Sequence, residues 1–468
     1  MSTFGALNTA YRGLTAAQQA MTVAGQNIAN AATDGYTRQR VEQSAIAAPA
    51  QGLNGSGRPE VGQGVSVDSI ARLGNTSLDA SVRSASAQAG YASTRSAALQ
   101  GIEGVLQEPG DNGISTALQG FWAAWQGAAR QPDDDGPKGL LLTAANSLTD
   151  KISTGYQALQ AQWSSVRAKA SDTVDAVNAA ASQVAAYNAT IRSTVAAGGT
   201  ANELIDARAK LTETIARLAG GTVREQPDGT VDVHIGGNAL VMGTSVRTLA
   251  LSGHSTDALG APVQLLWKNP DGVASADGGE IAGALSVLAP AAGGNGGAIA
   301  EAAASYNGLA TALATAVNTV HQTGTTGSGS TGTDFFTITG PSAALGIKGP
   351  ASTSAVALGK SSSGAFDTSV ADAMAQLGTG STSPDKLWSG IVTGIGVQSR
   401  GAQQREDLAA ATQASAVTGR ASQTSVSLDE ENVNLLTNQH AYQAAARVMT
   451  AVDEALDVLI NRTGLVGR

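Results

Sequence analysis

Cysteine is absent from this chain of 468 residues, so disulfides, thiolate metal sites and a cysteine nucleophile are excluded. Aromatic residues supply only 4% of the sequence and charged residues only 14%. So little charge is unusual in a freely soluble monomer, whereas uncharged polar surface suits packing between subunits. The formal net charge of −9 argues against nucleic acid and against an anionic membrane as partners.

Long apolar runs are missing too. No stretch of 18 consecutive apolar residues occurs, so we expect no transmembrane helix. The N-terminus lacks the basic region and apolar core of a secretory signal peptide. If this chain is exported, it must use another route.

Residue patterns that carry catalysis are also missing. The four histidines form no HExxH pattern, and no GxSxG pattern positions a serine nucleophile. Gly359-Lys360-Ser361 is similar to the end of a phosphate-binding loop, but Ser354 stands where its first glycine belongs. We therefore predict that the protein is not an enzyme and has no catalytic residue, cofactor site or metal site.

Apolar stripes with heptad spacing are present at both ends of the chain. Alternating steps of three and four put one narrow seam on a helix, and such a seam needs a helical partner. The N-terminal stripe comprises Leu7, Tyr11, Leu14, Gln18, Met21, Gly25 and Ile28. The C-terminal stripe comprises Leu435, Asn438, Tyr442, Ala445, Met449, Val452, Leu456 and Leu459. On spacing alone, an intramolecular coiled coil and an interface between subunits are equally good readings.

Between these ends, the pattern predicts long helices with β-rich inserts. Helices are expected at about 3–30, 75–106, 139–197, 299–321 and 383–419, and one opened by a Thr200/Glu203 capping box. Alternation at Val231, Val233 and Ile235 predicts a strand, and Gly236-Gly237 predicts the hairpin turn after it. A turn-rich stretch is expected at 52–59, and short strands and loops at 335–382.

Several segments resemble one family. NIANAATDGYTRQRV, Asn27 to Val41, is similar to the signature of the axial proteins of the bacterial flagellum. Gly35, Tyr36, Arg38 and Gln39 fit the hook-associated protein 1 family among them, although Asp34 stands where many rod and hook proteins have proline. The C-terminal segment 425–460 resembles the family's last helix, and 202–211 and 278–283 resemble its central domain.

The resemblance implies a mainly α-helical fold with β-rich inserts. Residues 1–72 and 421–468 would form a terminal coiled-coil domain. Residues 73–321 and 383–420 would form an elongated helical bundle with a β-rich segment at about 222–285. Residues 322–382 would form a small outer insert of loops and strands.

The implied function is that of a structural protein, a ring of subunits at the junction between hook and filament. The implied partners are copies of the chain, the hook protein, the filament-side junction protein (hook-associated protein 3) and an export chaperone on the C-terminal helix. The implied location is extracellular, on the flagellum, after export of the unfolded chain by the flagellar type III apparatus without a cleaved signal. A hook, rod or filament-side junction protein is the alternative, and an enzyme carried on a flagellar scaffold is a weaker one.

Assembly residues are predicted from the two stripes and the signature. We expect Gly35-Tyr36 to end the first helix and turn the chain outward, with Tyr36 against a neighbour or half-buried. Arg38 and Arg40 are candidates to pair with the acids Asp429 to Glu431. The predicted assembly interface comprises Leu7, Tyr11, Leu14, Met21, Ile28, Gly35, Tyr36, Leu435, Tyr442, Ala445, Met449, Val452, Leu456 and Leu459.

Overall fold

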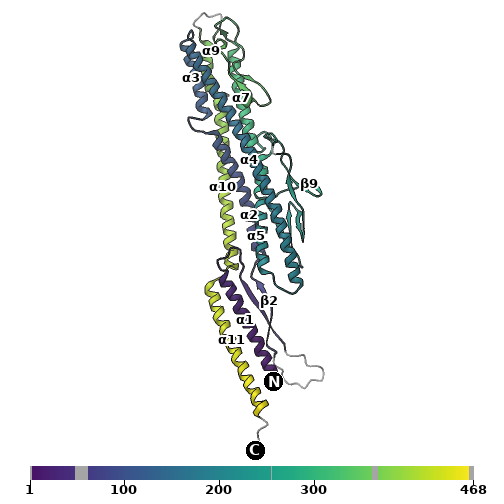
Figure 1. Ribbon diagram of the computed structural model, residues 1–468. Coiled ribbons are helices and arrows are strands. Elements are labelled where there is room, and N and C mark those ends of the chain that lie inside the picture. Colours follow the sequence, from purple (N-terminus) through teal and green to yellow (C-terminus); the bar gives the residue numbers. More distant parts are fainter. Residues whose placement is uncertain (1–2, 48–61, 255, 361–366, 463–468) are drawn as a thin grey trace, which may run out of the picture.

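The first and last helices of the chain lie side by side at one end of an elongated molecule (Figure 1). The computed structural model describes residues 3–47, 62–254, 256–360 and 367–462. The predicted turn at 52–59 lies outside the described residues. No helix within the described ranges is both long and apolar enough to cross a membrane.

The terminal part consists of two helices and a two-stranded antiparallel sheet. Its elements are α1 (Thr3–Ala29), β1 (Gln39–Ala45), β2 (Val65–Arg72) and α11 (Leu428–Asp457), which runs into a π-helical turn at Val458–Arg462. The Ser427 hydroxyl accepts a hydrogen bond from the Glu430 amide and caps α11. Acidic residues in the first turn of α11 complement the positive end of its dipole.

The middle part is a bundle of long helices. Its main members are α2 (Thr76–Leu106), α3 (Ile114–Arg130), α4 (Asp135–Ala196), α5 (Asn202–Ala219), α7 (Ala298–His321) and α10 (Pro384–Thr424). The 62 residues of α4 extend about 93 Å at the usual rise per residue. Apolar side chains of α2, α3, α4, α7 and α10 share one continuous core, in which Trp125, Trp163 and Trp388 are fully buried.

A β-rich segment packs on α4 and α5. Its strands are β3 (Thr222–Glu225), β4 (Val231–Ile235), β5 (Asn238–Met242), β6 (Ser245–Val246), β7 (Leu249–Leu251), β8 (Leu265–Lys268) and β9 (Asp271–Val273), followed by helix α6 (Gly279–Leu288). They form an antiparallel sheet of four strands and one of three. Val231, Val233 and Ile235 all point into a second core, as their alternation predicts.

Residues 322–360 and 367–382 lie at the far end of the bundle (Figure 1). Their elements are β10 (Thr325–Thr326), β11 (Thr337–Ile338), α8 (Ala343–Gly346), β12 (Ile347–Lys348), β13 (Ala357–Gly359), α9 (Ser369–Gln376) and two single 3₁₀ turns (Thr353–Ala355 and Leu377–Thr379). Phe335 and Phe336 are buried against Phe121 of α3, at ring-centroid distances of 5.8 and 5.5 Å. This segment therefore contributes to the main bundle core.

The predicted fold class, mainly α-helical with β-rich inserts, is confirmed. The Ser383 hydroxyl caps α10 and Pro384 occupies its first position, as expected. The predicted capping box at Thr200 and Glu203 is wrong. Ala201 is the N-cap of α5, and its methyl side chain cannot accept a hydrogen bond. Glu203 accepts a hydrogen bond from Gln39.

Candidate assembly site and the joint beside it

Helices α1 and α11 pack antiparallel through a stripe of small residues on α1. This stripe also has heptad spacing, and its members are Ala6, Ala10, Gly13, Ala17, Ala20, Ala24 and Asn27. A Cβ atom placed on Gly13 would lie 4.0 Å from the Cβ of Ala445. Small side chains therefore allow the two backbones to approach closely, while α11 supplies the larger residues.

The predicted C-terminal stripe is the face of α11 turned toward α1. Leu435, Tyr442, Ala445, Met449, Val452 and Leu456 are all half-buried. Leu459, one turn further along, is 53% exposed. Burial of this stripe is thus only partial in a single chain.

The predicted N-terminal stripe lies beside the small-residue stripe, one position along the helix. Leu7, Leu14, Met21 and Ile28 are half-buried, and Tyr11 is 58% exposed. Because one residue turns the helix by about 100°, these larger side chains do not face α11 directly. α1 therefore carries two heptad stripes, of which the small-residue stripe is the more buried.

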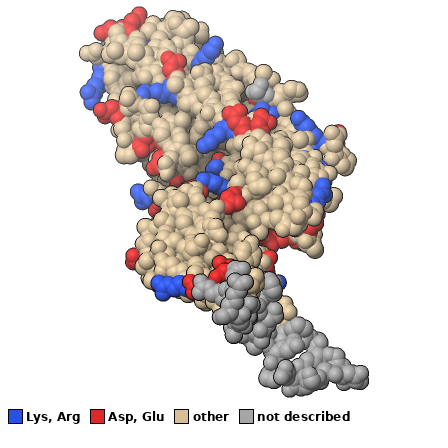
Figure 2. Space-filling view, turned by 60° about the horizontal axis from the view of Figure 1, so that its bottom comes forward, with Lys and Arg blue, Asp and Glu red and all other residues tan. Residues whose placement is uncertain are grey.

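The outer face of α11 is also apolar in part. Val433, Leu436 and Val448 are 62%, 56% and 49% exposed. Figure 2 shows acidic and basic side chains interspersed over the visible face of the molecule, with wide uncharged areas between them. Apolar side chains that one chain leaves uncovered on both terminal helices are typical of a surface that further subunits cover.

A dense polar joint connects the terminal helices to the bundle. The prediction that Gly35-Tyr36 ends the first helix is wrong, because α1 ends at Ala29 and a run of turns follows. Gly35, with a φ of +81°, lies in these turns, and Tyr36 follows half-buried. The Tyr36 hydroxyl donates a hydrogen bond to Asn27 Oδ1 at 2.8 Å. Burial, with smaller contributions from neighbouring carboxylates including that of Glu203, raises the pKa of Tyr36 to about 12.

Arg38 joins this turn to the start of α11. Its guanidinium contacts Glu430 Oε2 at 2.7 Å and Glu431 Oε1 at 2.7 Å, so the predicted pairing with the acidic run is confirmed for Arg38. The predicted pairing is wrong for Arg40, which contacts Glu42 of its own strand. The Arg40 side chain is exposed and lies beside Glu42 on β1.

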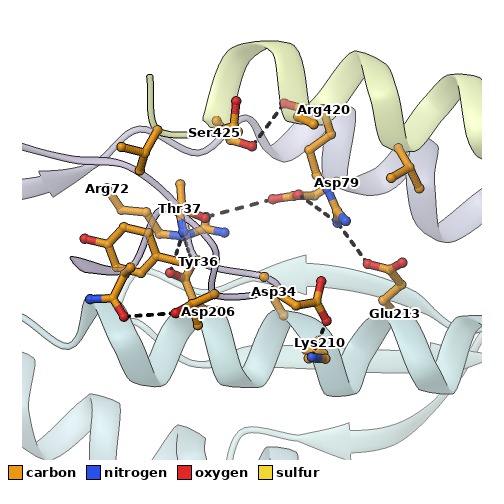
Figure 3. A pocket seen from close by; sticks show the side chains of 18 of the residues that line it. Asp34, Tyr36, Thr37, Arg72, Asp79, Asp206, Lys210, Glu213, Arg420 and Ser425 are labelled. Carbon is orange, nitrogen blue, oxygen red and sulfur yellow. Dashed lines mark hydrogen bonds and ion pairs between the residues drawn. The ribbon is translucent and has the colours of Figure 1, made fainter. Parts of the chain in front are cut away.

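Asp206 of α5 holds the joint from the bundle side. Its carboxylate accepts the Thr37 backbone N–H at 2.9 Å and Arg72 Nε at 2.5 Å (Figure 3). Next to it, Lys210 contacts the exposed Asp34, and this hydrogen bond lowers the pKa of the Asp34 carboxyl. The joint thus ties the signature turn to α5 and β2.

Arg420 adds the end of α10 to the same joint. Its guanidinium lies 2.9 Å from Glu213 Oε2 and 3.7 Å from Asp79 Oδ1. The groups surround a cavity of about 390 Å³ between the turns after α1 and the helices α2, α5 and α10, and both acidic and basic side chains line it (Figure 3). Balanced ion pairs fix geometry and leave no excess charge for a ligand, and the described residues contain no metal-binding cluster.

The joint brings together four segments that are far apart in the sequence. Asn202 Nδ2 donates to Gln39 Oε1 at 3.1 Å, and Asn27 Nδ2 donates to Glu431 Oε2 at 3.1 Å. Asn27, Asn202 and Asp206 are joint residues that spacing and charge in the sequence do not predict. A signal was present, because all three belong to the segments that carry the family resemblance.

Comparison with known proteins identifies the family. The model of the flagellar hook-associated protein FlgK helical domain matches residues 99–336. Models of a flagella basal body rod protein and of the C-terminal part of flagellar basal body rod FlgEFG proteins match residues 7–37 and 417–462. Flagellar hook-associated protein 1 of Bacillus subtilis is 30% identical over the full length of both chains. The chain belongs to the flagellar hook-associated protein 1 family.

Other relatives match a smaller part of this chain. The Escherichia coli flagellar hook-associated protein 1 is 28% identical over 72% of this chain and 60% of its own length. The solved structure of the flagellar hook junction protein FlgK from Burkholderia pseudomallei covers 55% of this chain and 46% of its own, with 22% identity and a TM-score of 0.47. Membership of the hook-associated protein 1 family makes this chain a structural protein of the bacterial flagellum.

Proposed function

We propose that this protein is a subunit of a ring at the junction between the flagellar hook and the filament. The observation that carries this proposal is the pair of apolar faces that α1 and α11 leave uncovered at one end of the molecule. Neighbouring subunits bury these faces in the proposed ring. The predicted assembly residues from Leu7 to Ile28 are assigned to this contact. The stripe from Leu435 to Leu459 packs on α1 and is assigned to the contact only through the part of its surface that α1 leaves exposed.

The proposed ring places the terminal domain, 1–72 and 421–468, inside, and the bundle, 73–321 and 383–420, with the segment 322–382 outside. The hook protein binds one side of the ring and hook-associated protein 3 binds the other. The chain is exported unfolded by the flagellar type III apparatus, and a chaperone covers the α11 face before export. An apolar stripe that is exposed on an unassembled chain favours aggregation, which gives this masking a physical reason.

The alternative of a hook, rod or filament-side junction protein shares the terminal helices but is disfavoured by the central match at residues 99–336. The alternative of a scaffold-borne enzyme predicts paired carboxylates between residues 324 and 382. The aspartates in that range instead accept local hydrogen bonds: Asp334 from Gln322, Asp367 from the Ser369 amide and Asp372 from Thr368. These contacts support structural roles for all three.

The test is complementation of a strain that lacks the gene with a chain carrying Met21→Glu. We expect the purified variant to fold normally, because Met21 lies outside the small-residue stripe, and to restore no motility. Gln19→Glu is the matched control, since Gln19 is exposed on the opposite side of the same helix, and it should restore swimming. Full swimming with Met21→Glu would refute the assignment of this face to the ring.

A further inference from the structure

The contact between α1 and α11 along the small-residue stripe fixes the distance between the two helices. It does not by itself fix their register. Every α1 residue from Ala6 to Ala24 in this stripe is alanine or glycine. A shift of α11 by one heptad, about 10 Å along the axis, brings another set of its larger residues onto the same smooth surface. The seam alone therefore offers several registers of similar packing.

One polar contact at the upper end of the seam distinguishes these registers. Glu431 is the only buried residue among the described residues of α11, and its side chain is 3% exposed. Its Oε2 accepts the Asn27 amide at 3.1 Å, and its Oε1 accepts Arg38 Nε at 2.8 Å. Loss of such partners leaves a buried carboxylate without compensation, which strongly destabilises the folded state.

Asn27 is itself held in one orientation. Its Oδ1 accepts the Tyr36 hydroxyl at 2.8 Å and the Gln39 backbone N–H at 3.0 Å. Its Nδ2 donates to the Gln39 carbonyl at 2.9 Å and to Glu431. All four hydrogen-bonding positions of this amide are therefore used, and one of them depends on α11.

The spacing along the two helices agrees with a single register. Fourteen residues separate Asn27 from Gly13 on α1, and fourteen separate Glu431 from Ala445 on α11. A slip of one heptad puts Asn438 where Glu431 lies and leaves Arg38 without its buried carboxylate. We infer that Glu431 is a positioning residue that sets the register of α1 against α11 through Asn27 and Arg38.

This inference concerns the fold of one chain and does not depend on the proposed junction role. Register decides which outer residues of α1 and α11 lie at the same height, and so which composite surface the terminal helices present. A buried polar group that selects one helix register at the expense of stability is a known device in coiled coils.

The test uses engineered cysteine pairs in the full-length chain, which has no cysteine of its own. The in-register pair is Gly13→Cys with Ala445→Cys, because the 4.0 Å between these Cβ positions suits a disulfide. The off-register pairs are Gly13→Cys with Asn438→Cys and Gly13→Cys with Val452→Cys. Each off-register pair reports a slip of one heptad, in one direction or the other.

In the parent background, we expect the in-register pair to oxidise at least about tenfold faster than either other pair, a difference of about 1.4 kcal/mol. In Glu431→Gln, we expect this ratio to fall severalfold. Glu430→Gln is the matched control, because Glu430 contacts the same arginine but its side chain is 63% exposed, and it should leave the ratio unchanged.

A double variant separates register from stability. Asn27→Leu with Glu431→Leu replaces the buried polar contact by apolar side chains, so we expect helix content to be retained while off-register oxidation increases. An unchanged preference for the in-register pair in this folded double variant would overturn the inference. No preference in the parent chain would overturn it as well.

Discussion

Removal of the Asp206 carboxylate is expected to loosen the joint between the terminal helices and the bundle without unfolding the bundle. The side chain is 9% exposed and accepts two hydrogen bonds, from the Thr37 N–H and from Arg72. In Asp206→Ala, Arg72 keeps Asp79 at 3.9 Å, so the loss is closer to one charged hydrogen bond than to two. Such a bond contributes about 2 kcal/mol.

The effect is local because neither hydrophobic core contains a described residue of α1, β1, β2 or α11. The assay is hydrogen exchange of the Thr37 amide, which Asp206 accepts directly and which is buried. A loss of about 2 kcal/mol in opening free energy corresponds to exchange about 30-fold faster. The Val233 amide, in the second core, should exchange at its original rate.

Lys210→Ala is the control for this experiment, because Lys210 lies on the same helix but its pair with Asp34 is exposed at both ends. It should change Thr37 exchange very little. Two results would refute the reasoning: less than a threefold change in Asp206→Ala, or equal acceleration at Thr37 and Val233.

Two further predictions concern the bundle. Gly90→Ala places a Cβ against the backbone oxygen of Arg217 and should destabilise the protein by about 1–3 kcal/mol. Gly104→Ala, in open space on the same helix, should stabilise it by about 0.5–1 kcal/mol; thermal unfolding of both variants tests the pair. Burial lowers the pKa of His321, whose neutral ring accepts the Ala357 N–H at Nε2. The free energy of unfolding should therefore fall as the pH drops below about 6.5. In that range His321 binds a proton in the unfolded chain but stays neutral in the folded chain. His321→Gln should reduce that slope in urea unfolding between pH 7 and pH 5, and an unchanged slope would contradict the assignment.

The helices could be predicted from the sequence because their signals are local. Repeated spacings of three and four, the cap at Ser383 and the Gly198-Gly199 break describe α10 and α4 to within a few residues. The face of α1 that packs on its own chain could not be predicted in the same way. Two stripes of heptad spacing lie one residue apart, and the larger residues gave the stronger hydrophobic signal although alanine and glycine face α11.

The joint was predictable only in part. The Arg38 pairing with Glu430 and Glu431 follows from opposite charge beside the two terminal helices, once these helices are assumed to pair. Contacts such as Thr37 to Asp206 connect positions 169 residues apart and leave no periodic trace in one sequence. Hydrogen bonds of this kind depend on the packing of complete elements, so the structure was needed to find them.

Deletion of the gene, followed by electron microscopy of the cells and analysis of the medium, tests the proposed junction role most directly. We expect hooks that carry no filaments, together with flagellin subunits released into the medium. The parent gene should restore filaments when it is supplied in trans. Normal filaments on the deletion strain would contradict the account.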